Sequence, residues 1–329
     1  MKGLDLDRLR SWLGTGELTA TMFEGGRSNL TYAVSDGTDR WVLRRPPLGH
    51  VLPTAHDMAR EHKVLTALSA AGFPVPRPVR LCTDPGVIGA PFYLMEHAGG
   101  TIYRSVAALE SLGSPALHDL VLSLVDTLAD LHALDPAAIG LGDFGRPEGF
   151  NERQVRRWKK QLDASRSREV PGIEELHARL AVDIPAGGPG TVVHGDYRLD
   201  NVLITDGCRV GAVLDWEMST LGDPLSDVAL MLVYTQRPLL TLDGQARTPA
   251  SVEGHPTAAD MVARYAARSG RDVSDLGWYT AFAAFKLAVI LEGVHYRYVS
   301  GQTLGEGFDT VGALVQPLVM QGLSELEAV

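Results

Sequence analysis

One stretch of the sequence constrains the fold more than any other. It begins at Asp196, passes through four residues to Asn201, and continues into an apolar run at Val202 to Ile204. After a short turn, a second apolar run, Val210 to Leu214, leads directly into Asp215. Two apolar runs on either side of a short turn predict a β-hairpin. The two acids and the amide are therefore expected to converge on one site.

These residue types suit one kind of chemistry. Phosphoryl transfer needs a carboxylate that orients the attacking hydroxyl and accepts its proton, and a Mg²⁺ ion that neutralises charge on the γ-phosphate. Asp196 fits the first role. Magnesium takes oxygen ligands and usually keeps some water, so one carboxylate and one amide oxygen beside the nucleotide phosphates suffice. Asp215 and Asn201 fit that role, and the spacing is that of a kinase catalytic loop and its metal-binding strand end.

The same residues also suit an ordinary turn. Asp, Asn and Gly are common in turns for backbone reasons, so His194, Asp196 and Asp200 on their own are compatible with a structural hairpin. The full pattern of an Asp, an Asn and a second Asp across two apolar strands favours the catalytic interpretation.

A kinase of this kind needs a loop that covers the phosphates, and residues 24–29 are the candidate. Gly25 and Gly26 let backbone N–H groups approach phosphate oxygens, and Ser28 adds a hydroxyl donor. Asn29 completes the expected nucleotide-binding segment. A Gly-Gly pair is also an ordinary hairpin turn, so the surrounding pattern carries this assignment.

A cation for the phosphates is expected on the strand from Trp41 to Arg44. Val42 and Arg44 alternate onto one face of that strand, which would meet the adenine and the phosphates. Arg44 stands where kinases usually carry a lysine, and its guanidinium can still pair with phosphate or carboxylate. Glu61, on the following helix, is the expected partner. Another arginine adjoins each of them, so the pairing stays open, and either charge alone is compatible with a solvated surface.

A connector between the two predicted lobes follows the apolar run from Phe92 to Met95. In a kinase such a hinge offers backbone carbonyl and amide groups to the adenine edge. Contacts from Glu96 and Ala98 would then not depend on their side chains. A plain edge strand has almost the same pattern.

The chain changes character near Gly99. Before it, short apolar runs alternate with turn signals, which predicts a small, mostly strand-built lobe with one helix. The expected strands are Thr31–Val34, Trp41–Arg44 and Phe92–Met95, and the expected helix is Met58–Ala71. After it, an apolar stripe from Leu117 to Leu131 predicts a long amphipathic helix at the start of a helical lobe. The sequence thus predicts an α+β chain with a nucleotide-binding lobe at 1–98 and a catalytic and substrate lobe at 99–329.

The segments HGDYRLDNVLI and VLDWEMSTLGDPLSDVA resemble those of the aminoglycoside phosphotransferase and choline kinase superfamily. The resemblance runs from Phe23 to about Ser300. It implies a bilobal, protein-kinase-like fold, with a small antiparallel-sheet N-terminal lobe and a larger, mainly helical C-terminal lobe. It also implies an ATP- or GTP-dependent kinase that phosphorylates a hydroxyl group of a small molecule.

The resemblance assigns roles within these segments. It implies that Asp196 is the catalytic base, that Mg²⁺ is held by Asn201 and Asp215, and that Asp227 is structural. His194 is expected to brace the loop.

The fragments VLRRPPLGH, NERQVRRWKKQ and AFAAFKLAVILEGVHYRY are most similar to a subgroup whose domain is also found fused to some acyl-CoA dehydrogenases. Residues 151–170 contain seven basic side chains and three acidic ones. Such a surface would repel a polycationic antibiotic and attract an anionic or hydroxyacyl-CoA-type acceptor. A true aminoglycoside phosphotransferase remains the alternative, and a solvated helix face explains the charges equally well.

The composition argues against two kinds of partner. Lys and Arg number 30 against 40 Asp and Glu, a net charge of −10, whereas nucleic acids and anionic membranes bind basic surfaces. The most apolar late stretch, Ala281 to Leu291, contains Lys286 and is shorter than the roughly 20 residues of a membrane span. We therefore expect no nucleic-acid and no membrane partner.

The cysteine content and the N-terminus favour a cytoplasmic protein. Cys82 and Cys208 are the only cysteines, too few for a disulfide framework. The first residues include acids and lack the apolar core of a signal peptide. The sequence does not indicate an oligomeric state.

Two other classes share the catalytic segment. A regulated protein kinase is opposed by Gly195, where protein kinases carry an arginine, and by Trp-Glu rather than Phe-Gly after Asp215. A nucleotide-binding pseudokinase or interaction module would keep the fold without turnover. Retention of all three catalytic positions favours an enzyme, and slow Mg²⁺-dependent ATP hydrolysis would separate the two.

Overall fold

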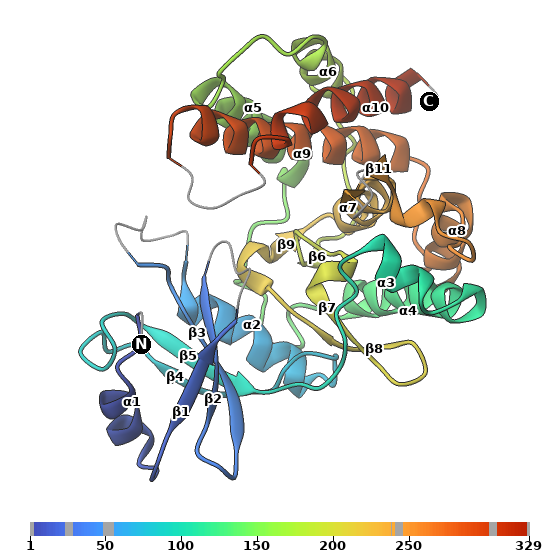
Figure 1. Cartoon of the computed structure of the whole chain (residues 1–329). Coiled ribbons are helices and arrows are strands. Elements are labelled where there is room, and N and C mark those ends of the chain that lie inside the picture. Colours follow the sequence, from blue (N-terminus) through green and yellow to red (C-terminus); the bar gives the residue numbers. More distant parts are fainter. Residues whose placement is uncertain are drawn as a thin grey trace. The chain divides into compact units, whose positions relative to one another are not determined.

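The computed structural model describes residues 3–23, 29–48, 56–237, 239–240, 246–302 and 308–327. They form two compact units (Figure 1). The first, called the sheet unit, comprises Met1–Ile102, Ala137–Leu141 and Leu199–Ser219. The second, called the helical unit, comprises Tyr103–Pro136, Gly142–Arg198 and Thr220–Val329. The expected lobes, 1–98 and 99–329, divide the chain at a single point. The units are each made of several segments, because Leu199–Ser219, which contains the predicted hairpin, belongs to the sheet unit.

A five-stranded antiparallel sheet in the order β1-β2-β3-β5-β4 forms the centre of the sheet unit. Its strands are β1 (Thr19–Met22), β2 (Leu30–Ser35), β3 (Arg40–Arg45), β4 (Pro78–Cys82) and β5 (Phe92–Glu96), and the helices with it are α1 (Leu6–Leu13) and α2 (Met58–Ala70). Alternate side chains of the central strands, such as Tyr32, Val34 and Leu43, enter one apolar core. The core keeps β3 in place, and β3 carries Arg44.

The boundaries of α2 follow from local chemistry. The Asp57 side chain accepts a hydrogen bond from the N–H of Arg60 at 2.9 Å and caps the start of the helix. Val64, Leu65 and Leu68 are buried on one face. Gly72 then adopts φ +77°, the left-handed conformation that commonly ends a helix. The helix presents Glu61 from its first turn.

The predicted hairpin consists of β7 (Val202–Thr205) and β8 (Arg209–Val213), preceded by the 3₁₀ turn η1 (Leu199–Asn201) and followed by η2 (Trp216–Met218). It is attached to the rest of the sheet unit through backbone bonds. The N–H of Val213 donates to the carbonyl of Pro74 at 2.8 Å. The N–H of Thr101 donates to the carbonyl of Ile204, also at 2.8 Å.

Helices dominate the second unit. They are α3 (Val106–Glu110), α4 (Ser114–Ala133), α5 (Phe150–Ala164), α6 (Ile173–Leu180), α7 (Leu225–Gln236), α8 (Ala258–Ser269), α9 (Leu276–Val299) and α10 (Val315–Glu327). Two-residue and three-residue strands complete it: β6 (Thr191–Val193) pairs with β9 (Thr220–Gly222), and β10 (Leu239–Leu240) pairs with β11 (Ala246–Arg247). The 3₁₀ turns η3 (Pro249–Ser251) and η4 (Val311–Leu314) lie between the later helices.

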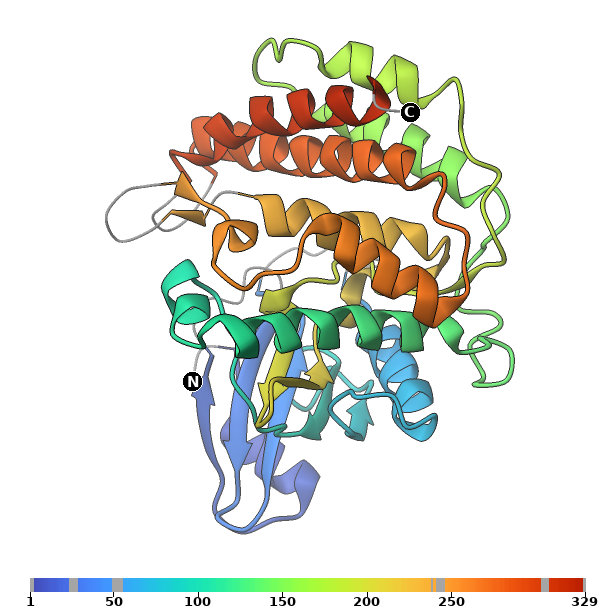
Figure 2. The same ribbon diagram turned by 90° about the vertical axis from the view of Figure 1, so that its right-hand side faces the viewer.

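Figure 2 shows α8 lying along α4. Arg264 forms a bidentate ion pair with Asp126, with both distances 2.7 Å. Arg268 pairs in the same way with Asp130 at 2.8 and 2.7 Å. Planar guanidinium groups match carboxylates in this geometry, so the two pairs fix the register of the helices.

Helix α9 is long and apolar enough to meet the length and hydropathy criteria for a membrane span, and 78% of its most apolar window is buried inside the structure. The core helix of a globular unit shows the same combination of properties. Lys286, which interrupts the apolar run, donates a hydrogen bond to the carbonyl of Gly195 within the same unit.

Candidate active site

Asp196 lies in the helical unit, on the loop that follows β6. Asp227 of α7 holds this loop: its Oδ2 accepts from the N–H of His194 at 2.6 Å and its Oδ1 from the N–H of Gly195 at 2.8 Å. The N–H of Asp196 in turn donates to Nδ1 of His194 at 3.2 Å. His194 and Asp227 therefore brace the loop, as the resemblance implied.

The charge of Asp227 is stabilised where it stands. Burial alone would raise the pKa of Asp227, but His132, with Nε2 3.5 Å from Oδ2, and the N–H of His194 hold that pKa below its ordinary value. Burial also lowers the pKa of His132. The brace is thus a carboxylate that accepts several hydrogen bonds.

This brace predicts an acid-sensitive contribution to stability. Because the pKa of Asp227 in the folded protein lies below its ordinary value of 3.8, the contribution is complete above that value and is lost as the pH falls through the folded pKa. We expect Asp227→Asn to lower the free energy of unfolding by about 3 kcal/mol at pH 7. Urea unfolding of both proteins between pH 3 and pH 7 measures this, and a difference that does not shrink towards pH 3 would contradict it.

The carboxylate of Asp196 has polar neighbours on several sides. The hydroxyl of Tyr234 donates to Oδ1 at 2.7 Å, and Nε of Arg198 lies 3.7 Å from Oδ2. Nζ of Lys286 donates to the carbonyl of Gly195 at 2.8 Å. The side chain of Asp196 remains 29% exposed, so it is accessible from solvent.

A second group of predicted residues meets around Arg44 in the sheet unit. Nε of Arg44 lies 3.0 Å from Oε1 of Glu61, a terminal nitrogen pairs with Oδ1 of Asp215, and the same nitrogen lies 3.3 Å from Oε2 of Glu217. Arg45 points to the other face of β3, where it donates to the carbonyl of Ile88 at 2.9 Å. The structure thus pairs Glu61 with Arg44, and Arg45 does not take part in this ion pair.

The arrangement around Arg44 balances burial against charge. Burial raises the pKa of Glu61 above its ordinary value of 4.5, and Arg44 partly offsets this. For Arg44, burial opposes the charge, but Glu61, Tyr93, Asp215 and Glu217 together raise its pKa. The guanidinium is therefore a fixed cation held among carboxylates.

Pairing in the hairpin brings Asn201 next to Asp215. The N–H of Leu214 donates to the carbonyl of Asn201 at 2.8 Å. Asp215 then adopts φ +67° and ψ +62°, in the left-handed region that residues other than glycine seldom occupy. Such conformations persist where the surroundings impose them and are common at functional sites.

The donor set suits magnesium. Asp215 and Asn201 offer one carboxylate and one amide oxygen, which are hard ligands, and Asp215 is 33% exposed. Within the described ranges, no group of three or more His, Cys, Asp or Glu side chains could hold a metal ion. A magnesium ion here would therefore take its remaining ligands from phosphate oxygens and water.

The other predicted nucleotide contacts differ in their surroundings. Asn29 is buried, donates to Oε2 of Glu217 at 2.9 Å, and accepts from Nδ1 of His56 at 2.8 Å. Val42 is buried on β3. The N–H of Glu96 donates to the carbonyl of Arg77 at 2.9 Å.

The backbone N–H groups at the two positions expected to form a hinge differ. The N–H of Glu96 is taken, whereas Ala98 makes no backbone hydrogen bond within the described part of the chain. Gly25, Gly26 and Ser28 lie outside the described residues.

Two site residues have no signal of their own in the sequence. Glu217 follows Asp215 by two positions and joins Arg44 to Asn29. Tyr234 reaches Asp196 from 38 positions away. Spacing from the catalytic segment could have suggested Glu217, but only tertiary packing brings Tyr234 to Asp196.

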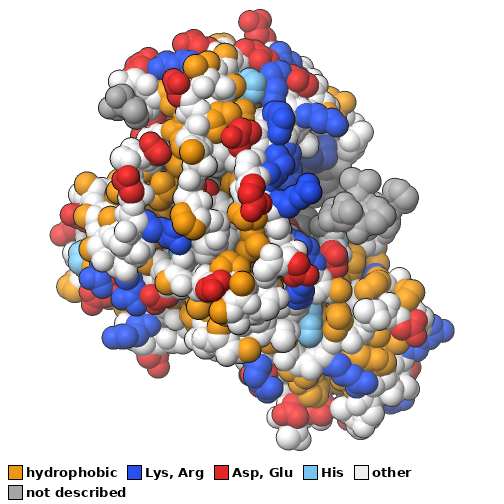
Figure 3. Space-filling view, turned by 180° about the vertical axis from the view of Figure 1, so that it is seen from behind, with side chains coloured by type: hydrophobic (Ala, Val, Ile, Leu, Met, Phe, Trp, Pro, Cys, Tyr) orange, Lys and Arg blue, Asp and Glu red, His pale blue; other side chains and the backbone are white. Residues whose placement is uncertain are grey.

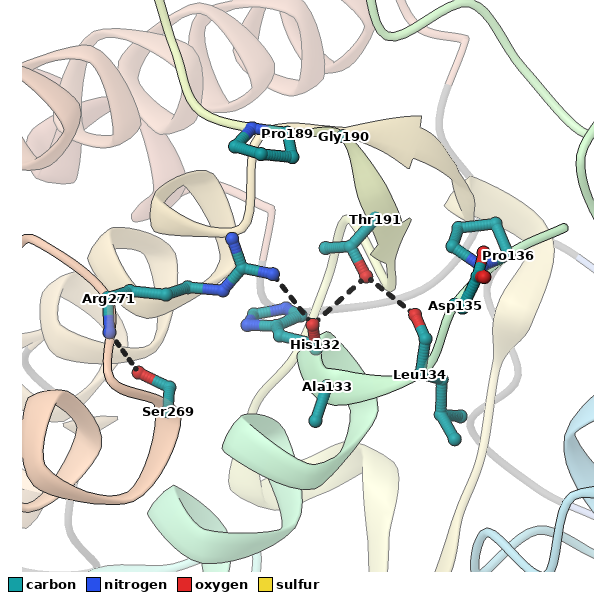
Figure 4. Close-up of a pocket in the computed structure, with 10 residues that line it drawn as sticks. All are labelled: His132, Ala133, Leu134, Asp135, Pro136, Pro189, Gly190, Thr191, Ser269 and Arg271. Carbon is teal, nitrogen blue, oxygen red and sulfur yellow. Dashed lines mark hydrogen bonds between the residues drawn. The ribbon is translucent and has the colours of Figure 1, made fainter. Parts of the chain in front are cut away.

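A cavity of about 280 Å³ lies in the helical unit, and Figure 4 shows residues that line it. Its lining includes Thr191, Arg271 and the main chain at His132, whose carbonyl accepts from Arg271 at 2.8 Å. None of the predicted site residues lines it. One lining residue, His132, contacts Asp227 of the brace.

Basic residues of α5 and of the segment that follows it lie at the surface, and some of them pair with acids. Lys159 pairs with Asp163, Arg166 with Glu174 and Arg168 with Glu292. Arg156, Arg157 and Lys160 are exposed and, among the described residues, have no carboxylate partner. Figure 3, the view from behind, shows Lys and Arg side chains gathered at the upper right. This part of the view corresponds to the upper left of Figure 1, where α5 lies.

Comparison with known proteins places this geometry in context. A model of the phosphotransferase enzyme family matches residues 19–270. Over 313 residues the chain is 39% identical to acyl-CoA dehydrogenase family member 11 of Rattus norvegicus. The matched region covers 93% of this chain and 40% of the rat protein. The chain thus spans less than half the length of this relative.

Solved structures share the fold. A candidate aminoglycoside phosphotransferase from Ralstonia eutropha JMP134 matches with a TM-score of 0.85 and 31% identity over 98% of both chains. Choline kinase from Cryptosporidium parvum Iowa II matches with a TM-score of 0.67 and 14% identity over 98% of this chain and 93% of that one. The predicted α+β, kinase-like fold and the superfamily resemblance are confirmed.

Proposed function

Because the chain belongs to the phosphotransferase enzyme family, we propose that it is a kinase that transfers the γ-phosphoryl group of ATP or GTP to a hydroxyl group of a small molecule. The cluster around Arg44 supports this best. A kinase needs a phosphate-binding cation fixed by an acid, beside a metal-binding aspartate. Arg44, Glu61 and Asp215 have these relations in the sheet unit.

On the nucleotide side, Arg44 binds phosphate oxygens while Glu61 keeps its guanidinium in place. Asn201 and Asp215 hold Mg²⁺, which when bound neutralises charge on the phosphates. The segment with Gly25, Gly26 and Ser28 covers the phosphates, an assignment that comes from the sequence alone.

On the acceptor side, Asp196 orients the hydroxyl of the small molecule and takes its proton. The bracing of the loop by Asp227 supports this role, because it fixes the backbone on which Asp196 stands. The acceptor oxygen then attacks the γ-phosphorus as the bond to the departing nucleoside diphosphate breaks.

For the acceptor, we propose an anionic compound such as a hydroxyacyl-CoA-type molecule. The exposed Arg156, Arg157 and Lys160 of α5 support an anion. The name of the rat relative suggests acyl-CoA chemistry, although the chain covers only 40% of that protein. The name of the Ralstonia structure favours the alternative, an aminoglycoside acceptor.

A panel assay tests the proposal. Purified protein is incubated with [γ-³²P]ATP, Mg²⁺ and, in separate reactions, hydroxyacyl-CoA compounds, sugars, amino alcohols and aminoglycosides. We expect labelled product from an anionic acceptor and none with EDTA. Label on aminoglycosides alone would support the alternative acceptor. Nucleotide binding without transfer to any compound or to water would contradict the proposed enzyme.

A further inference from the structure

Tyr234 is a partly buried residue of α7 that the proposed mechanism does not yet use. It lies in the last turns of the helix whose first turn carries Asp227. Its hydroxyl donates to Oδ1 of Asp196 at 2.7 Å, a good hydrogen-bond length for an O–H donor. One helix therefore holds both the backbone of the catalytic loop and the carboxylate at its tip.

We propose that Tyr234 is a positioning residue for phosphoryl transfer, whose hydroxyl fixes one oxygen of Asp196 so that the other faces the acceptor. This inference rests on the proposed function of Asp196. In the step, the acceptor O–H bond breaks and its proton moves to Oδ2. The acceptor oxygen forms a bond to the γ-phosphorus, and the bond to the nucleoside diphosphate breaks.

A tyrosine suits this task because it donates without taking the proton away. Burial raises the pKa of Tyr234, and the neighbouring carboxylate of Asp196 raises it further. The hydroxyl therefore stays protonated and serves only as a donor. A carboxylate with one oxygen held in this way loses little orientational freedom when the acceptor arrives.

The ring of Tyr234 has a second contact. The guanidinium carbon of Arg198 lies 4.8 Å from the ring centroid, a cation–π distance. Nε of the same arginine lies 3.7 Å from Oδ2 of Asp196. The hydroxyl of Tyr234 thus sets one oxygen of the carboxylate, and its ring supports the cation beside the other.

These two contacts can be separated by substitution. Tyr234→Phe removes the hydroxyl and keeps the ring under Arg198, whereas Tyr234→Leu removes both. Tyr279→Phe is the matched control, because it also deletes a hydrogen-bonded tyrosine hydroxyl, one that accepts from Nδ2 of Asn151 at 2.8 Å. Melting temperatures of the three variants show whether each is folded.

The assay is Mg²⁺-dependent release or transfer of label from [γ-³²P]ATP, with water or a panel acceptor. We expect Tyr234→Phe to lower kcat about tenfold, the value of one hydrogen bond to a charged group. The Kd for the non-hydrolysable analogue AMP-PNP should stay within about twofold. Tyr234→Leu should lower kcat further than Tyr234→Phe does. Tyr279→Phe should retain the wild-type kcat.

A double-mutant cycle supplies the decisive comparison. If Tyr234 acts through Asp196, adding Tyr234→Phe to Asp196→Asn causes no further decrease in single-turnover rate. Equal decreases in both backgrounds, or a fully active Tyr234→Phe, would overturn the inference and leave the proposed function intact. A wild-type protein without any Mg²⁺-dependent turnover would contradict both.

Discussion

The variant Asp215→Ala should abolish Mg²⁺-dependent phosphoryl transfer, with turnover reduced by about a thousandfold or more. The substitution removes the carboxylate proposed to hold Mg²⁺ and one of the acids that fix Arg44. Transfer of label from [γ-³²P]ATP, measured across a Mg²⁺ titration, tests this. We expect raised Mg²⁺ concentrations to restore little of the lost rate.

Two further variants make the result specific. Asp206→Ala changes an exposed aspartate in the turn between β7 and β8 and should retain full activity. Asp215→Asn keeps a residue that tolerates the left-handed φ of +67°, so it separates loss of the charge from strain in the backbone. Wild-type turnover with an unchanged Mg²⁺ requirement in Asp215→Asn would argue that the charge of Asp215 is not needed to hold the metal.

For Asp196→Asn we expect turnover to fall by about 10²- to 10⁴-fold, the usual contribution of a positioned general base. The amide has nearly the shape of the carboxylate, and its oxygen can still accept from Tyr234. Affinity for the nucleotide should be nearly unchanged, because Asp196 is not among the proposed nucleotide ligands, which include Arg44, Asn201 and Asp215.

Paired measurements test this expectation. Single-turnover transfer gives the chemical rate, and titration with AMP-PNP and Mg²⁺ gives the affinity. Asp183→Asn, at an exposed aspartate of the helical unit, is the control and should behave as wild type. A fully active Asp196→Asn protein would be incompatible with a role as base.

Local patterns in the sequence were sufficient for the central elements. The helix predicted from Met58 to Ala71 is α2, and the predicted strands around Thr31, Trp41 and Phe92 are β2, β3 and β5. Each has buried residues at a regular period or a capping residue at its end, and both signals act over a few neighbouring positions. The hairpin after Asn201 was predicted for the same reason.

The edges of the sheet had no comparable signal. Strand β1 (Thr19–Met22) contains exposed side chains at three of its four positions, and β4 begins at Pro78. Neither shows the alternation of apolar and polar residues that a half-buried strand displays. Their pairing to β2 and β5 depends on residues elsewhere in the chain.

The site shows the same limit. Strand alternation placed Val42 and Arg44 on one face, but the sequence could not choose between neighbouring arginines as the partner of Glu61. That choice follows from burial of Arg44 beside Glu61 and from the bonds of Arg45 to main-chain carbonyls. Tyr234 is another example, because nothing within α7 indicates that its hydroxyl meets Asp196.

The identity of the cation on β3 has a consequence for the behaviour of the protein in alkaline solution. An amine at this position would lose its charge as the solution becomes basic, but a guanidinium does not do so in any solvent in which proteins stay folded. Burial opposes the charge of Arg44, yet Glu61 and the other neighbouring groups raise its pKa further. Any decline of turnover at high pH must therefore originate in a different group.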